Sequence, residues 1–132
     1  MAVLTQEMKD MVNNGQCFIG TVSRDGKPNI GPKMTARIFN DETIIFNERT
    51  GGRTYFNILE GSKVTIAVAN EENPDGFRFI GSAEVHTYGE LYEKEAAFGE
   101  ETVAQRTKAI ILVHIDEIHS LKPGPMAGAK IG

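Results

Sequence analysis

The segment CFIGTVSRDGKPNIGPKMTARIF, residues 17–39, decides the fold because it predicts two strands joined by a tight turn. Residues 17–23 are rich in β-branched and aromatic side chains, which favour a strand. Asp25 and Gly26 form a dipeptide that two-residue hairpin turns prefer. Residues 29–39 then alternate apolar and polar side chains, as a strand with two different faces does. The segment therefore predicts an antiparallel hairpin.

The rest of the chain alternates short strand-like segments with short amphipathic helices. Four further segments are rich in β-branched or alternating apolar residues and predict strands. Three segments carry apolar residues at helical spacing. A final segment with two prolines and three glycines predicts an extended tail. We expect strands at residues 43–47, 63–70, 77–87 and 108–115, helices at 4–13, 53–59 and 90–98, and the tail at 121–132.

Six short strands with interspersed helices, and no alternating strand–helix–strand pattern, predict a mainly β protein of the α+β class. A small antiparallel barrel is the architecture that this order favours. The chain has 132 residues, without repeats or linkers, so residues 1–132 are expected to form a single domain.

The composition narrows the function classes. The net charge of −4 argues against nucleic-acid binding through general basicity. The single cysteine, Cys17, excludes an intrachain disulfide and a multi-cysteine metal cluster, and the three histidines lack ligand-like spacing. We therefore expect no metal site. No apolar run reaches the length of a membrane span, and the first residues lack a signal-peptide core, so a cytoplasmic protein is expected.

A glycine-rich loop before the second predicted helix is a candidate anion site. Gly51 and Gly52 allow close backbone approach, and the helix start offers free N–H groups. Arg53 adds a forked donor and Thr54 a hydroxyl, while Arg49 could add a second charge. The alternative is a solvated loop, because two glycines before a helix are common.

The second predicted strand could strengthen this site. Lys33, Thr35 and Arg37 project from one face at a period of two. On an ordinary exposed face this pattern is unremarkable. If the face meets the loop of Arg53, however, three cationic side chains converge in a chain of net charge −4, which would mark a site for an anionic ligand.

An ordered set of short motifs runs from the first hairpin to the fifth predicted strand. No single motif is diagnostic, whereas their order and spacing together are specific. The set comprises Gly26, Pro28, Asn29, Pro32, Lys33, Arg37 and Asp41, then residues 51–55 with Asn57 and Ile58, then Lys63 and Val64, and then residues 77–85.

This ordered set resembles the pyridoxamine 5′-phosphate oxidase-related family of FMN-binding split-barrel flavoproteins, over about residues 15–120. The resemblance implies a six-stranded split β-barrel with short flanking helices. It also implies a homodimer with FMN at the interface. Strand residues near Phe77 and Phe79, the segment near Arg106, and the tail are the candidate surfaces for the partner. The chain is shorter than the full oxidases and lacks their C-terminal segment, so oxidation of pyridoxamine phosphate is not expected.

The resemblance also carries cofactor-binding residues onto this sequence by position. Residues of the second strand lie near the flavin or ribityl group, residues at the end of the third strand follow, and the glycine-rich loop holds the phosphate. Thr54 stands where the larger oxidases commonly have lysine, and Arg37 where they have a lysine near the substrate. The expected cofactor-binding residues are Pro32, Lys33, Met34, Thr35, Arg37, Asn47, Glu48, Gly52, Arg53, Thr54 and Arg106.

We therefore expect an FMN-dependent oxidoreductase or electron-transfer flavoprotein whose substrate is unknown. Lys33, or a backbone N–H beside it, is the candidate group for stabilising the reduced flavin anion. The alternatives are a non-enzymatic protein that binds or stores flavin, and a split barrel that binds haem or a deazaflavin. Fold alone does not separate them.

Overall fold

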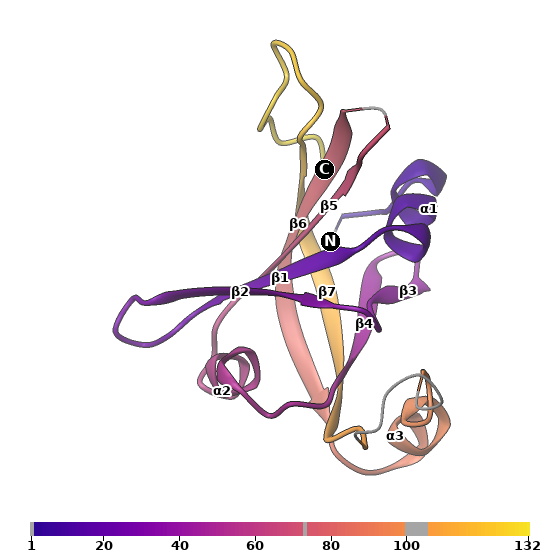
Figure 1. The fold of residues 1–132 in the computed structure, drawn as a ribbon, viewed down its shortest axis with the longest axis vertical. Coiled ribbons are helices and arrows are strands. Elements are labelled where there is room, and N and C mark those ends of the chain that lie inside the picture. The colour runs from indigo at the N-terminus through magenta and orange to yellow at the C-terminus, as the bar shows by residue number, and fades with distance from the viewer. Residues whose placement is uncertain (1, 73, 100–105) are drawn as a thin grey trace.

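The computed structural model describes residues 2–72, 74–99 and 106–132, which form a strongly curved antiparallel sheet with three helices (Figure 1). The strands follow the order β2-β1-β5-β6-β7-β4-β3. None of the described helices is long and apolar enough to cross a membrane. The elements are α1 (Gln6–Asn14), β1 (Cys17–Val22), β2 (Pro28–Lys33), β3 (Arg37–Asn40), β4 (Thr43–Glu48), α2 (Arg53–Leu59), β5 (Val64–Asn70), β6 (Asp75–His86), α3 (Glu90–Glu95) and β7 (Ala109–Ser120).

The two edge strands of the sheet are consecutive in the chain. β2 ends at Lys33 and β3 begins at Arg37, so residues 34–36 cross from one edge to the other. This short crossing requires the sheet to curl until its edges approach, which is the geometry of a split barrel. The expectation of one strand over residues 29–39 is therefore wrong. The sheet has seven strands among the described residues instead of six, while the fold class is confirmed.

The core combines the inward side chains of the strands with Met8 and Val12 of α1. Phe77 and Phe79 of β6 belong to it, with exposed fractions of 7% and 0%. The two rings are therefore no part of a partner surface, while the expectation of such a surface on the strand near them stays a prediction.

β7 extends beyond the predicted strand over residues 108–115. A bulge interrupts the alternating pattern, so the second half of the strand does not show in the sequence. The register of β6 and β7 shifts between Ile80, which pairs with Glu117, and Gly81, which pairs with Ile115. A Cβ atom at Gly81 would lie 2.2 Å from the carbonyl oxygen of His114, so only glycine fits at this point. The extra residue breaks the alternation of buried and exposed side chains along β7.

Both ends of the described chain are hydrogen-bonded to β7. The backbone N–H of Ala2 donates to the carbonyl of Ile115 at 3.0 Å. The last residues fold back, and Ile131 N–H donates to Ile118 at 2.8 Å. Residues 121–132 thus form a loop that returns to its own strand, and the extended tail that the sequence predicts is not observed.

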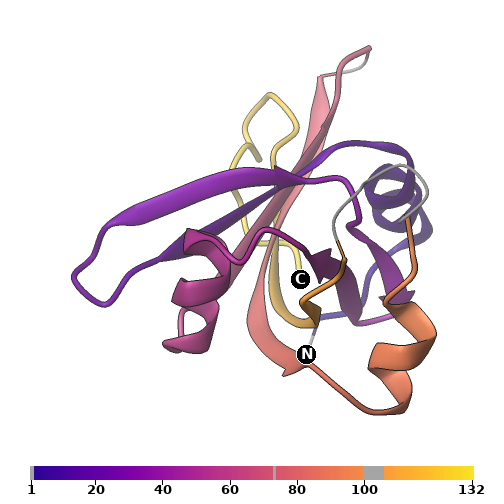
Figure 2. The same cartoon turned by 60° about the horizontal axis from the view of Figure 1, so that its bottom comes forward.

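The β1–β2 hairpin projects from the body of the molecule, and α2 lies beside it (Figure 2). Ile58 and Asn57 are the buried residues of α2, whereas Phe56 and Leu59 are 57% and 55% exposed. This arrangement brings the start of α2 close to the inner face of the hairpin.

Candidate functional site

A buried ion pair joins the end of β2 to the end of β4. Lys33 Nζ lies 2.7 Å from Oε1 of Glu48, and their side chains are 14% and 1% exposed. The other oxygen, Oε2, accepts hydrogen bonds from Thr50 N–H at 3.1 Å, Thr50 Oγ1 at 3.0 Å and Gly51 N–H at 2.9 Å. The carboxylate of Glu48 thus organises the loop that follows its own strand.

The electrostatics of Glu48 follow from these contacts. Burial alone would raise the pKa of its carboxyl group. Hydrogen bonds from Lys33, Gly51 and Thr50, together with the charge of Lys33, outweigh that effect and hold the pKa below its ordinary value. Glu48 is therefore an anion at neutral pH inside the loop, and it neutralises Lys33.

The loop continues into α2 with an exposed cation. Gly52 is the N-cap and makes no side-chain capping bond. Arg53 is exposed and makes no hydrogen bond or ion pair with any described residue. Thr54 is half-buried, and its Oγ1 accepts a hydrogen bond from Asn29 Nδ2 at 3.0 Å. Of the cationic groups expected here, Arg53 is the one that remains available to an anion.

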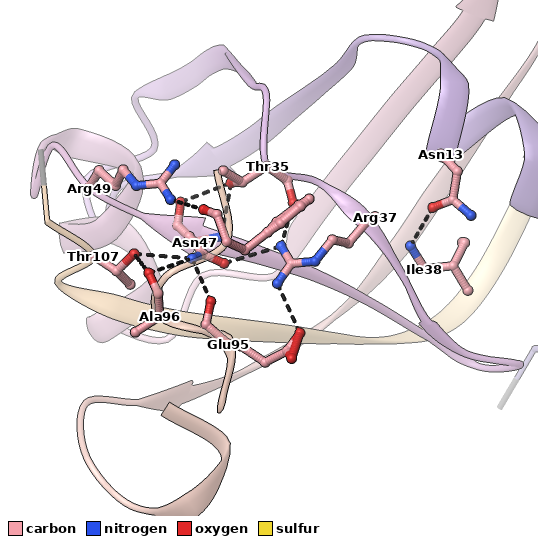
Figure 3. A network of polar contacts seen from close by, with 10 residues as sticks. Asn13, Thr35, Arg37, Ile38, Asn47, Arg49, Glu95, Ala96 and Thr107 are labelled. Carbon is pink, nitrogen blue, oxygen red and sulfur yellow. Dashed lines mark hydrogen bonds and ion pairs between the residues drawn. The ribbon is translucent and has the colours of Figure 1, made fainter. Parts of the chain in front are cut away.

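Thr35 and Asn47 form the link between the β2–β3 crossing and β4. The Thr35 hydroxyl donates to the Asn47 carbonyl at 3.1 Å and accepts from the Asn47 N–H at 2.9 Å. Both residues are buried. The amide of Asn47 continues the network to Glu95 O at 3.0 Å and to Thr107 Oγ1 at 3.0 Å (Figure 3).

Arg37 points toward α3 and its C-terminal extension rather than toward Arg53. Its guanidinium pairs with Glu95 at 3.0 Å and donates to Asn47 Oδ1 at 3.1 Å (Figure 3). The Cζ atom lies 3.7 Å from the ring centroid of Phe98, a cation–π contact. Burial lowers the pKa of Arg37; Glu95 opposes this shift, and the charge of Arg49 adds to it.

Arg49 also turns away from the glycine-rich loop. It is 93% buried, since 7% of its surface is exposed, and its Nη2 donates to the carbonyl of Phe98. Its Nε atom has no hydrogen-bond partner within the described ranges. Arg49, which the sequence suggested as a second charge for the glycine-rich loop, thus points to the segment after α3.

The structure places the remaining expected residues outside both networks. Met34 is 83% exposed and lies in the crossing between the edge strands. Pro32 is exposed near the end of β2, and Arg106 is exposed three residues before β7 begins. Lys33 and Arg37 both point into the protein. Lys33 reaches the glycine-rich loop through Glu48, as expected, whereas Arg37 pairs with Glu95 and does not.

Sequence reasoning missed several residues that build these networks. Asn29 was part of the family pattern without a role, and its contact with Thr54 spans 25 positions. Glu95 and Thr107 carry no local signal, because each acts through a partner far away in sequence. The available signal was Asn29 itself, a polar residue close to the hairpin turn.

An open groove lies elsewhere on the surface, between α1 and the end of β5. Asp10, Met11, Phe18, Val68 and Leu121 are among its lining residues. None of the expected cofactor residues lines it. The candidate site therefore lies at the polar contacts around Arg53 and Glu48, outside this groove.

Known proteins resemble the chain over nearly its whole length. The sequence pattern of the family described as pyridoxamine 5′-phosphate oxidase matches residues 4–122. An uncharacterised protein of Methanocaldococcus jannaschii is 32% identical, in a match that covers 97% of this chain and 87% of that protein.

Solved structures show the same similarity. HupZ of Group A Streptococcus is 39% identical, with 98% and 99% of the two chains covered and a TM-score of 0.85. An FMN-binding protein of Syntrophomonas wolfei superposes with a TM-score of 0.75, covering 90% of this chain and 86% of that chain. At 18% identity, this second likeness is one of fold.

Proposed function

Because this chain belongs to the pyridoxamine 5′-phosphate oxidase family, we propose that it is an FMN-binding flavoprotein that acts as an oxidoreductase or electron-transfer protein. One observation carries the proposal. Arg53 is an exposed guanidinium at the first residue of α2, next to Thr54 in the sequence, and has no acceptor among the described residues. A guanidinium and a hydroxyl in the same first helical turn suit the oxygens of a phosphate group.

The neighbouring cations support Arg53 as the phosphate ligand. Lys33 is neutralised by Glu48, and Arg37 is paired with Glu95. Arg49 is buried and directed to the carbonyl of Phe98. The FMN phosphate is therefore assigned to Arg53, Thr54 and the backbone at Gly52.

The flavin ring is assigned to the free edge of β2 and the start of the crossing. An edge strand presents one row of backbone groups that no neighbouring strand pairs. Pro32 and Met34 add exposed apolar surface on which a planar ring can rest. Asn47 and Glu48 are buried, so we assign them a supporting role: they hold the crossing and the glycine-rich loop in place.

FMN, when bound, supplies the electron-transfer chemistry, and the protein supplies binding and electrostatics. The Lys33–Glu48 pair carries no net charge. Stabilisation of negative charge on a reduced ring therefore falls to backbone N–H groups at the end of β2 more than to the Lys33 ammonium.

We also assign a homodimer to the outer face of the β1–β2 hairpin. Phe18, Val22 and Ile30 are 41%, 43% and 70% exposed on this face, which is opposite to the face that α2 covers. Contiguous apolar patches of this kind usually mark interaction surfaces. A partner at this face would lie beside the proposed ring site on β2.

The phosphate assignment is tested by Arg53→Ala. We expect FMN binding to weaken by about 1.5–3 kcal/mol, the scale of a charge-assisted hydrogen bond, in a fluorescence-quenching titration. Riboflavin, which lacks the phosphate, should bind both proteins equally. Arg24→Ala is the matched control, because Arg24 is exposed and contacts Glu60 at the other end of α2. Equal FMN affinity in the wild type and Arg53→Ala would refute the assignment.

The cofactor itself is tested by the absorption spectrum of the purified protein. Flavin bands that persist through gel filtration support the proposal, whereas a Soret band or no visible band would contradict it. Stopped-flow reduction of the flavin protein by NADH or NADPH then separates an oxidoreductase from a storage protein.

A further inference from the structure

Two amide–hydroxyl hydrogen bonds seat α2 on the β1–β2 hairpin. Asn29 Nδ2 donates to Thr54 Oγ1 at 3.0 Å, and Asn57 Nδ2 donates to Thr21 Oγ1 at 3.1 Å. Thr21 and Asn29 are direct cross-strand partners in β1 and β2. Thr54 and Asn57 are three positions apart, which places them on one face of α2. The two bonds are therefore neighbours, and they run in opposite directions between strand and helix.

The two bonds differ in their surroundings. Asn57 is fully buried and Thr21 is 7% exposed, so their bond lies inside the protein. Asn29 and Thr54 are half-buried at the first turn of α2, next to exposed Arg53. We call the Asn57–Thr21 bond the inner bond and the Asn29–Thr54 bond the outer bond. The inner bond can only stabilise the fold, whereas the outer bond lies where a ligand can reach.

The direction of the outer bond determines what the Thr54 hydroxyl can do. A hydroxyl has one proton to donate and can accept through its lone pairs. Because Thr54 accepts from the amide of Asn29, its own proton is left for another acceptor. Among the described residues, no acceptor takes that proton.

We propose that Asn29 is a positioning residue that fixes the Thr54 hydroxyl as a hydrogen-bond donor to the cofactor phosphate. This inference rests on the proposed function, since it takes Arg53 and Thr54 as the phosphate ligands. Asn29 acts through Thr54 and need not touch the phosphate. Its amide occupies a lone pair of the Thr54 oxygen, so the rotatable proton is directed away from Asn29.

A double-mutant cycle tests the proposal with FMN and riboflavin as probes. Dissociation constants are measured for the wild type, Asn29→Ala, Thr54→Val and the double variant. Asn29→Ala should weaken FMN binding about fivefold and leave riboflavin binding unchanged. In the Thr54→Val background, Asn29→Ala should have no further effect, because the hydroxyl through which it acts is gone.

Asn29→Asp gives a second, directional readout. A carboxylate at this position would accept the Thr54 proton instead of donating to its oxygen. It would also bring negative charge close to the phosphate. We expect a larger loss of FMN affinity than for Asn29→Ala, again without a change for riboflavin.

Thr21→Val is the matched control, because it breaks the inner bond of the same helix. It should lower the melting temperature, since the amide of Asn57 loses its partner, while the ratio of FMN to riboflavin affinity stays at the wild-type value. An equal loss for both probes in Asn29→Ala would overturn the positioning role. So would an effect that persists in Thr54→Val.

Failure of the proposed function has a different signature. If the wild type binds FMN no more tightly than riboflavin, the phosphate assignment is wrong, and the role of Asn29 falls with it. If the wild type and Arg53→Ala differ as expected while Asn29→Ala equals the wild type, the phosphate site stands and the positioning role alone is wrong.

Discussion

Lys33 Nζ lies 2.7 Å from Oε1 of Glu48, so the end of one edge strand is tied to the start of the glycine-rich loop by a buried ion pair. The pair is supported by the hydrogen bonds of Thr50 and Gly51 to the second carboxylate oxygen. Each charge therefore depends on the other for its place inside the protein.

Replacing Lys33 by Met should destabilise the fold by about 3 kcal/mol, because it leaves the Glu48 carboxylate buried without its cation. Urea unfolding followed by circular dichroism measures this change. Lys27→Met is the control, since Lys27 is exposed in the hairpin turn. A loss below about 0.5 kcal/mol for Lys33→Met would show that the loop hydrogen bonds alone hold the carboxylate.

The pH dependence of stability should reveal Glu48. Although burial opposes ionisation, Lys33, Gly51 and Thr50 hold its folded pKa below the unfolded value of about 4.3. The folded state then favours the anion, so this contribution is fully present above the unfolded pKa and is lost as the pH falls through the folded pKa. Glu48→Gln should remove this part of the acid sensitivity, measured as the urea midpoint at about pH 7 and about pH 3, so that the comparison reaches below the unfolded pKa. An unchanged pH slope in Glu48→Gln would contradict the prediction.

Replacing Ile30 by Glu should dissociate the proposed homodimer. Ile30 is 70% exposed in the centre of the apolar face of β2, and a buried carboxylate without a partner would oppose association. Sedimentation velocity gives the outcome directly. Val3→Glu introduces the same charge at an exposed apolar residue before α1, and it should leave the oligomeric state unchanged. If Ile30→Glu sediments like the wild type, this face is not the interface.

Cys17 should be unreactive in the folded protein. It is 1% exposed, and burial raises the pKa of its thiol to about 11. Because the thiolate is the nucleophile, alkylation by iodoacetamide at about pH 8 should be slow until the chain unfolds. Mass spectrometry with and without guanidinium chloride checks this. Rapid labelling of the native protein would show that β1 opens locally.

The break between β2 and β3 was beyond the reach of pattern reasoning. Apolar and polar residues alternate without interruption through Met34 and Ala36, which predicts one strand. The break arises because the Thr35 side chain bonds to both backbone groups of Asn47, as a neighbouring strand would. When a side chain takes the hydrogen bonds that a neighbouring strand would take, the alternation of apolar and polar residues does not change, so the sequence pattern does not show the break.

The start of α1 shows a similar limit. The pattern Thr5 followed by Met8 lacks the glutamate or glutamine that a capping box usually carries. In the structure, Met8 Sδ nevertheless accepts from Thr5 N–H at 3.4 Å, while Thr5 Oγ1 accepts from Met8 N–H at 3.3 Å. A thioether is a weak acceptor, so the residue type alone did not indicate this role.

The parts of the candidate site that adjacent residues build could be predicted from the sequence, whereas contacts between residues far apart in the chain could not. The loop of Gly52, Arg53 and Thr54 follows from adjacent residues, and the structure leaves Arg53 open to an anion. The commitment of Arg37 to Glu95 depends on a contact across 58 positions, which no local pattern reveals.

The position of β7 has a consequence for how the protein is made. This strand pairs with β4 on one side and β6 on the other, and it also binds Ala2 near the start of the chain. A nascent chain that has not yet reached Ala109 therefore lacks the strand that pairs with β4 and β6, and the apolar faces of these strands stay open to water. Because such non-local pairings form late and slowly, the sheet is completed only after the residues of β7 have left the ribosome. The synthesis of β7, more than any hairpin made earlier, sets the moment at which this fold becomes complete.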